Sequence, residues 1–102
     1  MAAGGEVCWY VYIVRCSDAT FYTGIATDVA RRMTEHNQDN QLAARYTRAR
    51  RPVSLIYCEP FTSRSLAAQR EYAIKQLTRR AKERLVRQFK GQQSLDEVQR
   101  HD

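Results

Sequence analysis

The sequence predicts a single α/β domain in which helices flank a small three-stranded antiparallel β-sheet. Three short runs are rich in β-branched and aromatic residues, and each is bounded by turn-forming or polar residues: 7–16, 21–25 and 53–58. Two other segments carry apolar residues at helical spacing. The 102 residues, 43% of them apolar, suffice for one modest core. We therefore expect a domain at residues 7–90 and flexible termini at 1–6 and 91–102.

The first two runs are expected to form a β-hairpin over residues 8–25, because a Ser-Asp-Ala-Thr turn signal separates them. Side chains alternate between the two faces of a strand, so Tyr10 and Tyr12 share one face of the first strand. Tyr22 and Gly24 share one face of the second strand for the same reason. The hairpin is therefore expected to present tyrosines from both of its strands.

A helix is predicted directly after the hairpin. Thr27 or Asp28 can cap its N-terminus, and Val29 begins its apolar stripe. At about 100° per residue, Arg32 lies about 60° from Val29 around the helix axis, and His36 lies about 20° from it. Both side chains can therefore reach a site at the edge of the sheet. Tyrosines on a hairpin, backed by a helix that carries a cation and an imidazole, are parts that a phosphodiester-cleaving site requires.

The remaining elements are a third strand and a long helix. A basic segment, 45–52, contains a proline just before the third strand, and this proline ends the segment. The long helix is expected to begin at Ser63 or Ser65 and to keep an apolar stripe as far as Ala81. A basic continuation is expected to extend this helix to about Lys90.

Positive charge is concentrated in the second half of the chain. The formal net charge is +6, and residues 45–90 hold 13 of the 17 lysines and arginines but only three acidic residues. This excess favours an anionic partner, nucleic acid ahead of a membrane, because no cationic stretch is paired with a long apolar face. An ordinary solvated basic surface is the alternative that charge alone leaves open.

Membrane and secreted classes of protein are disfavoured. The sequence has no run of about 18 apolar residues, and its N-terminus lacks the basic start and apolar centre of a signal peptide. The three cysteines show no Cys-x-x-Cys spacing, which argues against a disulfide framework and against a zinc site. We therefore expect a cytoplasmic protein that does not bind membranes.

Six residues at fixed spacings run through the predicted elements: Tyr12, Tyr22, Gly24, Arg32, His36 and Glu71. The second tyrosine follows the first by ten residues, the arginine follows the glycine by eight, and the histidine follows the arginine by four. This order resembles that of the GIY-YIG nuclease superfamily, and the short chain resembles its small standalone YhbQ-like group over about residues 9–90. Val11 and Thr23 replace the two isoleucines of the family pattern. Tyr10 replaces its first glycine and could narrow access to the site.

The resemblance implies a metal-dependent endonuclease that hydrolyses phosphodiester bonds in DNA. Glu71 would hold one divalent cation, Mg²⁺ or Mn²⁺, because such hard cations prefer carboxylate oxygen and retain several waters. Tyr22 would activate the attacking water, and Tyr12 would orient that water or Tyr22. Arg32 would stabilise the charged phosphate. His36 would contact the scissile phosphate or act as a general acid.

Each of these roles has a plainer structural alternative. Glu71 could be a surface residue that pairs with Lys75 one turn later. Arg32 could be an ordinary exposed helix arginine, and Tyr22 a half-buried strand aromatic. His36 could be a hydrogen-bonded histidine at the margin of the core.

Other expectations concern contacts with the substrate. Gly24 is expected to let a phosphate or metal approach the backbone, and an ordinary strand-end glycine is the alternative. The basic segment interleaves arginines with a tyrosine, which suits contact with phosphates and stacking on bases. The residues expected to bind nucleic acid are Arg45, Tyr46, Arg48, Arg50, Arg51 and Lys75.

The expected substrate is DNA, single-stranded or branched, and RNA is not excluded. We expect recognition of strand structure rather than sequence, because the chain carries no attached DNA-binding domain. The resemblance implies a role in DNA repair or recombination. Two other functions stay open: a nucleic-acid-binding module that keeps the fold without cutting, and an accessory subunit whose activity requires a protein partner.

Overall fold

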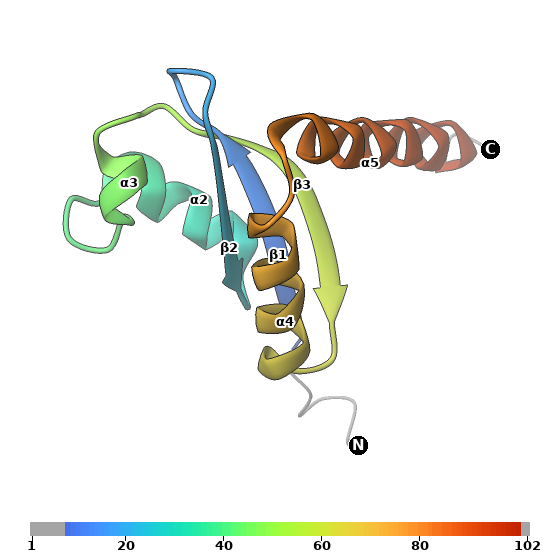
Figure 1. The fold of residues 1–102 in the computed structure, drawn as a ribbon, viewed down its shortest axis with the longest axis horizontal. Helices are drawn as coiled ribbons and strands as arrows, with labels where there is room; N and C mark the ends of the chain where they lie inside the picture. Colours follow the sequence, from blue (N-terminus) through green and yellow to red (C-terminus); the bar gives the residue numbers. More distant parts are fainter. Residues whose placement is uncertain (1–7, 101–102) are drawn as a thin grey trace.

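The computed structural model describes the backbone of residues 8–100 and the side chains of residues 8–89, and it confirms the predicted fold class (Figure 1). The strands are β1 (Trp9–Arg15), β2 (Phe21–Ala26) and β3 (Ser54–Phe61). They form one antiparallel sheet in the order β2-β1-β3, so β1 is central and the other two are edge strands. The helices are α2 (Val29–Gln38), α3 (Arg45–Arg48), α4 (Arg64–Lys75) and α5 (Arg79–Arg100).

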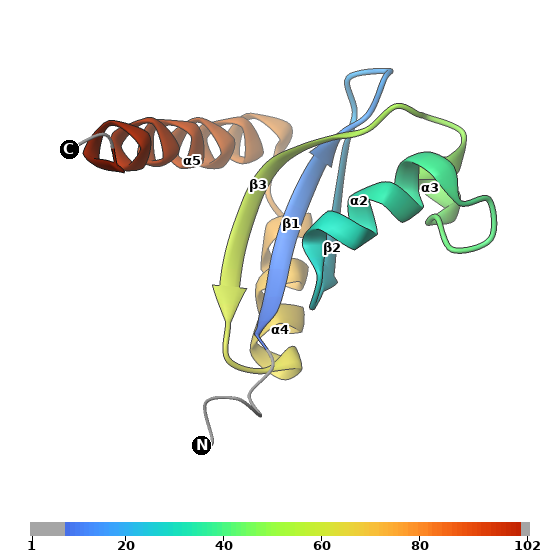
Figure 2. The ribbon, with the colours of Figure 1, turned by 180° about the vertical axis from the view of Figure 1, so that it is seen from behind.

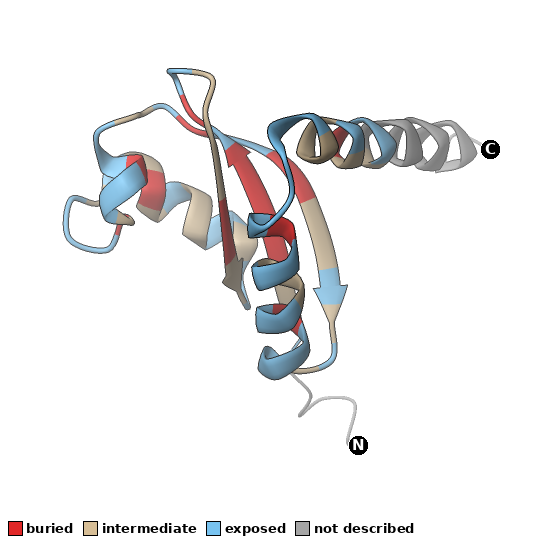
Figure 3. Cartoon of the chain, in the orientation of Figure 1, coloured by how far each residue is buried: buried red, intermediate tan, exposed pale blue. Residues whose placement is uncertain are grey.

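The sheet separates two apolar clusters, because the side chains of its central strand alternate between its faces. The cluster on the face covered by α4 and α5 contains buried residues of the sheet and of both helices: Val11, Ile13, Ile56, Tyr57, Ala67, Ile74 and Val86. Under α2 lie the buried residues Tyr12, Val14, Cys16 and Val53. Figures 1 and 2, seen from opposite sides, show α4 on one face of the sheet and α2 on the other. The central strand is accordingly the most continuously buried element (Figure 3).

The hairpin turn is held by its own backbone and by the start of α5. Cys16 N donates to Thr20 O at 2.8 Å, and Ala19 has the left-handed φ of 69°. Arg79 Nη1 donates to Ala19 O at 2.8 Å, and its guanidinium lies 3.8 Å from the centroid of the Phe21 ring. The first residue of α5 therefore ties this helix to the hairpin turn.

The helix starts follow the capping residues that the sequence offered. The carboxylate of Asp28 accepts a hydrogen bond from Arg31 N at 3.0 Å, so Asp28 caps α2. The hydroxyl of Ser63 accepts from Leu66 N at 3.1 Å, so Ser63 caps α4. At each start, the structure selects one of the two predicted caps.

The long helix predicted after the third strand is in fact two helices. The first, α4, ends at Lys75, and the hydroxyl of Thr78 accepts from Ala81 N at 3.1 Å at the beginning of α5. α5 then continues to Arg100 and so includes residues 91–100, which were predicted to belong to a flexible terminus. Residues 1–7 and 101–102 lie outside the described residues, so flexibility of the two ends stays a prediction.

Two smaller features also differ from the expected boundaries. β3 continues through Pro60 to Phe61. An edge strand tolerates proline, because an edge strand has a partner on one side only and the missing N–H can face away from the sheet. The basic segment contains the short helix α3, which apolar spacing did not indicate. None of the helices within residues 8–100 is long and apolar enough to cross a membrane.

Candidate active site

The predicted site residues come from four elements: Tyr12 from β1, Tyr22 and Gly24 from β2, Arg32 and His36 from α2, and Glu71 from α4. Tyr12 lies opposite Gly24 in the pairing of β1 with β2. The helix α2 covers the sheet face that carries both tyrosines, and α4 packs on the other face against β1 and β2. The edge strand β2 therefore lies where the two helices can approach one site.

Gly24 is needed for the packing of Tyr12. A Cβ atom at position 24 would lie 2.6 Å from Tyr12 Oη and 2.8 Å from Tyr12 Cζ. Both residues are buried, so the tyrosine ring occupies the space that a side chain would take. The expectation that Gly24 admits a phosphate or metal to the backbone is therefore corrected, because a protein side chain fills this position. Gly24 also lies within β2 rather than at its end.

A buried chain of hydrogen bonds begins at Tyr12. Its hydroxyl lies 2.8 Å from His36 Nε2, and His36 Nδ1 lies 2.8 Å from Thr47 Oγ1. The Thr47 hydroxyl donates to Ala44 O at 3.0 Å, and its only hydrogen is thereby used. His36 Nδ1–H consequently donates to Thr47, and Nε2 accepts from the Tyr12 hydroxyl. The histidine orients the tyrosine, and α3 orients the histidine.

His36 is uncharged in this setting. Its ring is fully buried, and this burial lowers the pKa of His36 to about 4. The positive charges of Arg32 and Arg51 contribute to this lowering of the pKa, and Glu35 opposes it. Both ring nitrogens already have partners within the protein. The expected direct contact between His36 and the phosphate does not fit this geometry, which favours the alternative of a hydrogen-bonded core histidine.

Tyr12 lies where several polar groups converge. Burial raises the pKa of Tyr12 to about 12, and the neighbouring Arg32 lowers it. The charges of Tyr22 and Glu71 act on the same hydroxyl and raise its pKa. Tyr12 therefore keeps its proton at neutral pH and can serve as a fixed hydrogen-bonding group. Residues from β2, α2 and α4 all lie close enough to influence it.

Arg32 is held in place from two sides. Its Nη1 donates to Glu35 Oε1 at 2.9 Å and to Leu42 O at 2.7 Å. The side chain is 25% exposed, whereas that of Arg31 is 69% exposed. Arg32 therefore lies toward the inner side of α2, in agreement with its predicted position about 60° from Val29, and its neighbour Arg31 faces solvent. Glu35 was missed as a supporting residue, although its spacing of three residues from Arg32 was a usable signal.

Tyr22 belongs to a stack of rings that leads out to the surface. Its ring meets His36 edge-on with 5.5 Å between centroids, and it stacks on Tyr46 with 6.0 Å between centroids. The guanidinium of Arg50 lies 3.9 Å from the centroid of the Tyr46 ring. The basic segment is thereby joined directly to Tyr22 of the candidate site.

Glu71 is a half-buried carboxylate with a cationic neighbour. Its side chain is 23% exposed, and Lys75 Nζ lies 3.2 Å from Glu71 Oε2. The ion pair offered by the plainer alternative is therefore present. Within the described residues, no three His, Cys, Asp or Glu side chains gather as a metal cluster. One carboxylate fits a hard cation that keeps several waters and shares a substrate phosphate, so the donor set suits Mg²⁺ or Mn²⁺.

Arg51 is occupied by the protein itself. Its Nε donates to His36 O at 2.6 Å, and its Nη2 donates to Asp39 O at 2.9 Å. Its Nη1 donates to Asn40 Oδ1 at 2.9 Å. The expected contact between Arg51 and nucleic acid does not fit these bonds, because the guanidinium already fastens the C-terminal end of α2.

The other basic residues of this segment surround an open hollow on α3 of about 680 Å³, lined by Arg45, Tyr46, Arg48, Ala49 and Arg50. Arg48 donates to Asn40 O, and Arg50 pairs with Asp18. Arg45 is exposed and makes no hydrogen bond or ion pair with the side chains described in residues 8–89. The hollow therefore offers cations and one aromatic ring beside Tyr22.

Tyr10 lies on the same sheet face as Tyr12, near the beginning of β1. It is paired with Ala26 on one side and Pro60 on the other. A hydrogen bond with Cys8 raises the pKa of Tyr10. Its effect on access to the site stays a prediction.

Comparison with known proteins gives a match over most of the chain. A family model described as the GIY-YIG catalytic domain matches residues 8–84. A UPF0213 protein of Desulfotalea psychrophila is 58% identical over 79 residues, which cover 78% of this chain and 71% of that protein. A UPF0213 protein of Halobacterium salinarum is 54% identical over 76 residues, which cover 74% of this chain and 96% of that protein.

Two solution NMR structures have a similar fold. A UPF0213 protein of Bacillus halodurans is 44% identical, with a TM-score of 0.50 over 78% of this chain and 82% of that chain. A protein of E. faecalis is 40% identical, with a TM-score of 0.55 over 82% of this chain and 90% of that chain.

Proposed function

The chain belongs to the GIY-YIG family of catalytic domains, and we propose that it is a metal-dependent endonuclease that hydrolyses phosphodiester bonds in DNA. The family implies a nuclease with a nucleic-acid substrate, and its nucleases generally use divalent metal ions. The observation that carries the proposal is that α2 and α4 pack on opposite faces of the same two strands, β1 and β2. They carry there a guanidinium, Arg32, and a half-buried carboxylate, Glu71, and both charges act on the pKa of Tyr12.

Each side chain has a separate task in this proposal. A divalent cation bound at Glu71 would act as a Lewis acid toward the phosphate. Arg32, anchored through one nitrogen, would neutralise charge that develops on the phosphate. Tyr22 would take part in activating the water, and Tyr12 would orient that water or Tyr22. His36 would act as a positioning residue that fixes the Tyr12 hydroxyl.

The proposal extends to the substrate and the setting of the reaction. We assign DNA with single-stranded or branched structure, read by shape rather than sequence, in repair or recombination. The hollow on α3 supports this assignment, because it places cations beside Tyr22. The helix α3 itself has only four residues and is too short to read a major groove. A cytoplasmic location is consistent with three cysteines that are all free.

The test is cleavage of end-labelled single-stranded, duplex and branched DNA with Mg²⁺ or Mn²⁺. Wild type should cut in a metal-dependent manner, and Glu71→Gln should lower the rate by about 100-fold or more, because the amide cannot hold the cation as a carboxylate does. Glu83→Gln is the matched control. Glu83 also pairs with a cation four residues away, Arg79, but lies on α5.

Equal cleavage by wild type and Glu71→Gln would contradict the assigned metal ligand. Salt-sensitive binding without cutting by either protein would instead indicate a nucleic-acid-binding module. Cutting that appears only after addition of cell extract would indicate a subunit that depends on a protein partner.

A further inference from the structure

The helix α4 has two unlike flanks. Ala67 and Ile74 are fully buried and face the sheet. Around the helix axis, Arg70 lies about 60° from Ala67 in one direction, and Glu71 lies about 40° from it in the other. Arg70 Nε lies 3.0 Å from Glu59 Oε1 of β3, so the Arg70 flank faces β3. The flank that carries Glu71 therefore faces β2 and the candidate site.

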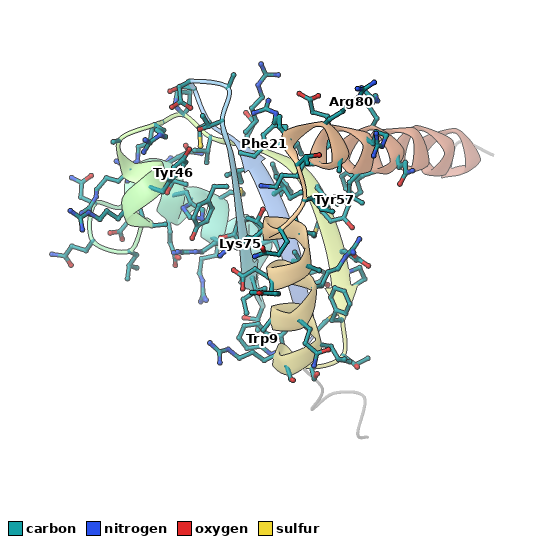
Figure 4. The ribbon with its side chains drawn as sticks, in the orientation of Figure 1. Trp9, Phe21, Tyr46, Tyr57, Lys75 and Arg80 are labelled. Atoms are coloured by element: carbon teal, nitrogen blue, oxygen red, sulfur yellow. The ribbon has the colours of Figure 1, made fainter. Side chains whose placement is uncertain are left out.

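Two further side chains follow Glu71 around this flank. Lys75 lies about 80° from the buried line of α4, and Tyr72 lies about 140° from it. Figure 4 shows Lys75 on the β2 side of α4 and Tyr57 on the β3 side. The exposed fraction rises in the same order, from 23% for Glu71 to 50% for Lys75 and 68% for Tyr72. Of these three side chains on the flank, Glu71 is thus the innermost and Tyr72 the outermost.

The ring of Tyr72 has no aromatic or guanidinium neighbour among the described residues, whereas the ring of Tyr46 on α3 has both. Tyr72 is the most exposed large apolar side chain described, and no aromatic ring or guanidinium within residues 8–89 covers it. Tyr46 is stacked on Tyr22 and contacted by Arg50. A free ring beside a carboxylate that would hold the cation and a lysine that can contact phosphate is suited to stacking on a nucleobase.

We propose that Tyr72 is a specificity-determining residue whose ring stacks on an unpaired nucleobase next to the scissile phosphate, so that the preferred substrate is single-stranded DNA. This inference rests on the proposed nuclease function. Lys75 contacts Glu71, and Tyr72 is three residues from Lys75 and therefore its neighbour on the helix surface. A strand whose phosphate lies at Glu71 and Lys75 thus brings a neighbouring base within reach of Tyr72. In a duplex, that base is paired and covered by its neighbours, and it offers no free face to the ring.

The test measures binding without a divalent cation, so that the result does not depend on cleavage. A labelled single-stranded oligonucleotide is compared with the same strand annealed to its complement. Tyr72→Ala should weaken single-strand binding about tenfold and duplex binding less than about twofold. Tyr72→Phe, which keeps the ring, should bind as wild type does. Leu66→Ala should also bind as wild type does, because Leu66 is an exposed residue, 45%, on the other flank of α4.

A second readout uses the wild-type protein alone. An oligonucleotide that carries 2-aminopurine should lose fluorescence on binding, because stacking quenches this base. Lack of quenching, equal weakening on both DNA forms, or a Tyr72→Phe protein as weak as Tyr72→Ala would each overturn the proposal. Single-strand binding that depends on the ring in a protein that never cuts would support the stacking and refute the nuclease. Unchanged cleavage by Tyr72→Ala on both DNA forms would overturn only the stacking.

Discussion

At the scale of single residues, the site depends on the absence of one methyl group. A Cβ at Gly24 would lie 2.6 Å from Tyr12 Oη, which is closer than packed atoms can approach. We expect Gly24→Ala to separate Tyr12 from His36, to lower cleavage about 100-fold and to cost about 1–3 kcal/mol of unfolding free energy. Cleavage assays and urea unfolding would measure the two effects.

Gly91→Ala is the matched control for this substitution. Gly91 lies in the helix α5, where alanine is the better helix former. The control should raise the unfolding free energy by up to about 1 kcal/mol and leave cleavage unchanged. A Gly24→Ala protein that cuts and unfolds as wild type does would show that the Tyr12 ring is not held against this strand.

His36 makes the stability of the fold depend on pH. Burial holds the pKa of His36 at about 4 in the folded protein, whereas the unfolded chain protonates near the ordinary value of about 6.5. Between these values the unfolded state binds more protons, so the contribution of His36 is complete above about pH 6.5 and is lost as pH falls toward 4. The expected loss is on the order of 3 kcal/mol. Urea unfolding over this pH range would measure it.

The substitution His36→Gln removes the titrating group and should flatten the stability curve in this window. The carboxyl groups of Asp18 and Asp39 have lowered pKa values because they accept hydrogen bonds, chiefly from Thr20 and from Leu42. Their protonation destabilises the fold only at more acidic pH. A slope between pH 6.5 and 4 that persists in His36→Gln would assign the effect to another group.

Some residues of the site could be predicted from the sequence, and others could not. Tyr12, Tyr22, Arg32 and His36 are related by strand alternation and helical period, which are local properties that spacing records. Thr47 was missed, because it lies on a four-residue helix with no periodic signal and contacts a residue eleven positions away. The altered role of Gly24 was also hidden, since only the three-dimensional structure shows which group fills the space beside it.

At the scale of elements, the break between α4 and α5 sets the direction of the last helix. Both halves keep helical spacing, so periodicity alone predicted one continuous helix. Leu77 N and Gln76 N still donate to carbonyls of α4, and Thr78 then caps a new helix. The break allows Val86 to reach the core under β3. A threonine cap inside an apolar pattern was the available signal, but it is weak because threonine also occurs within helices.

The hairpin and α5 support one another across this break. Arg79 begins the helix, and its guanidinium contacts the Phe21 ring and the Ala19 carbonyl. Phe21 directly precedes Tyr22, so a contact made on one face of β2 fixes the strand that presents a site residue on the other. An element far along the sequence thereby helps to hold the edge of the sheet that carries the candidate site.

At the scale of the whole molecule, positive charge lies on two separate regions. Figure 4 shows Tyr46 of α3 on one side of the sheet and Arg80 of α5 on the other. A notch of about 320 Å³ near the second region is lined by residues that include Arg15, Arg79 and Arg87. This positive charge is therefore divided between two regions rather than gathered in one stripe. A field of this kind attracts an anionic strand from several directions and falls with added salt.

Arg45 and Arg51 allow the contribution of this charge to binding to be separated from its contribution to folding. The sequence assigned both arginines to nucleic-acid binding, but Arg45 is exposed and Arg51 is bonded to three acceptors within the protein. Arg45→Gln should weaken DNA binding and reduce the slope of log affinity against log salt by about 0.7, since one phosphate contact is lost. Arg51→Gln should instead lower the unfolding free energy by about 1–3 kcal/mol. Salt titrations and urea unfolding of both variants test this assignment, and it fails if Arg51→Gln changes only the salt slope.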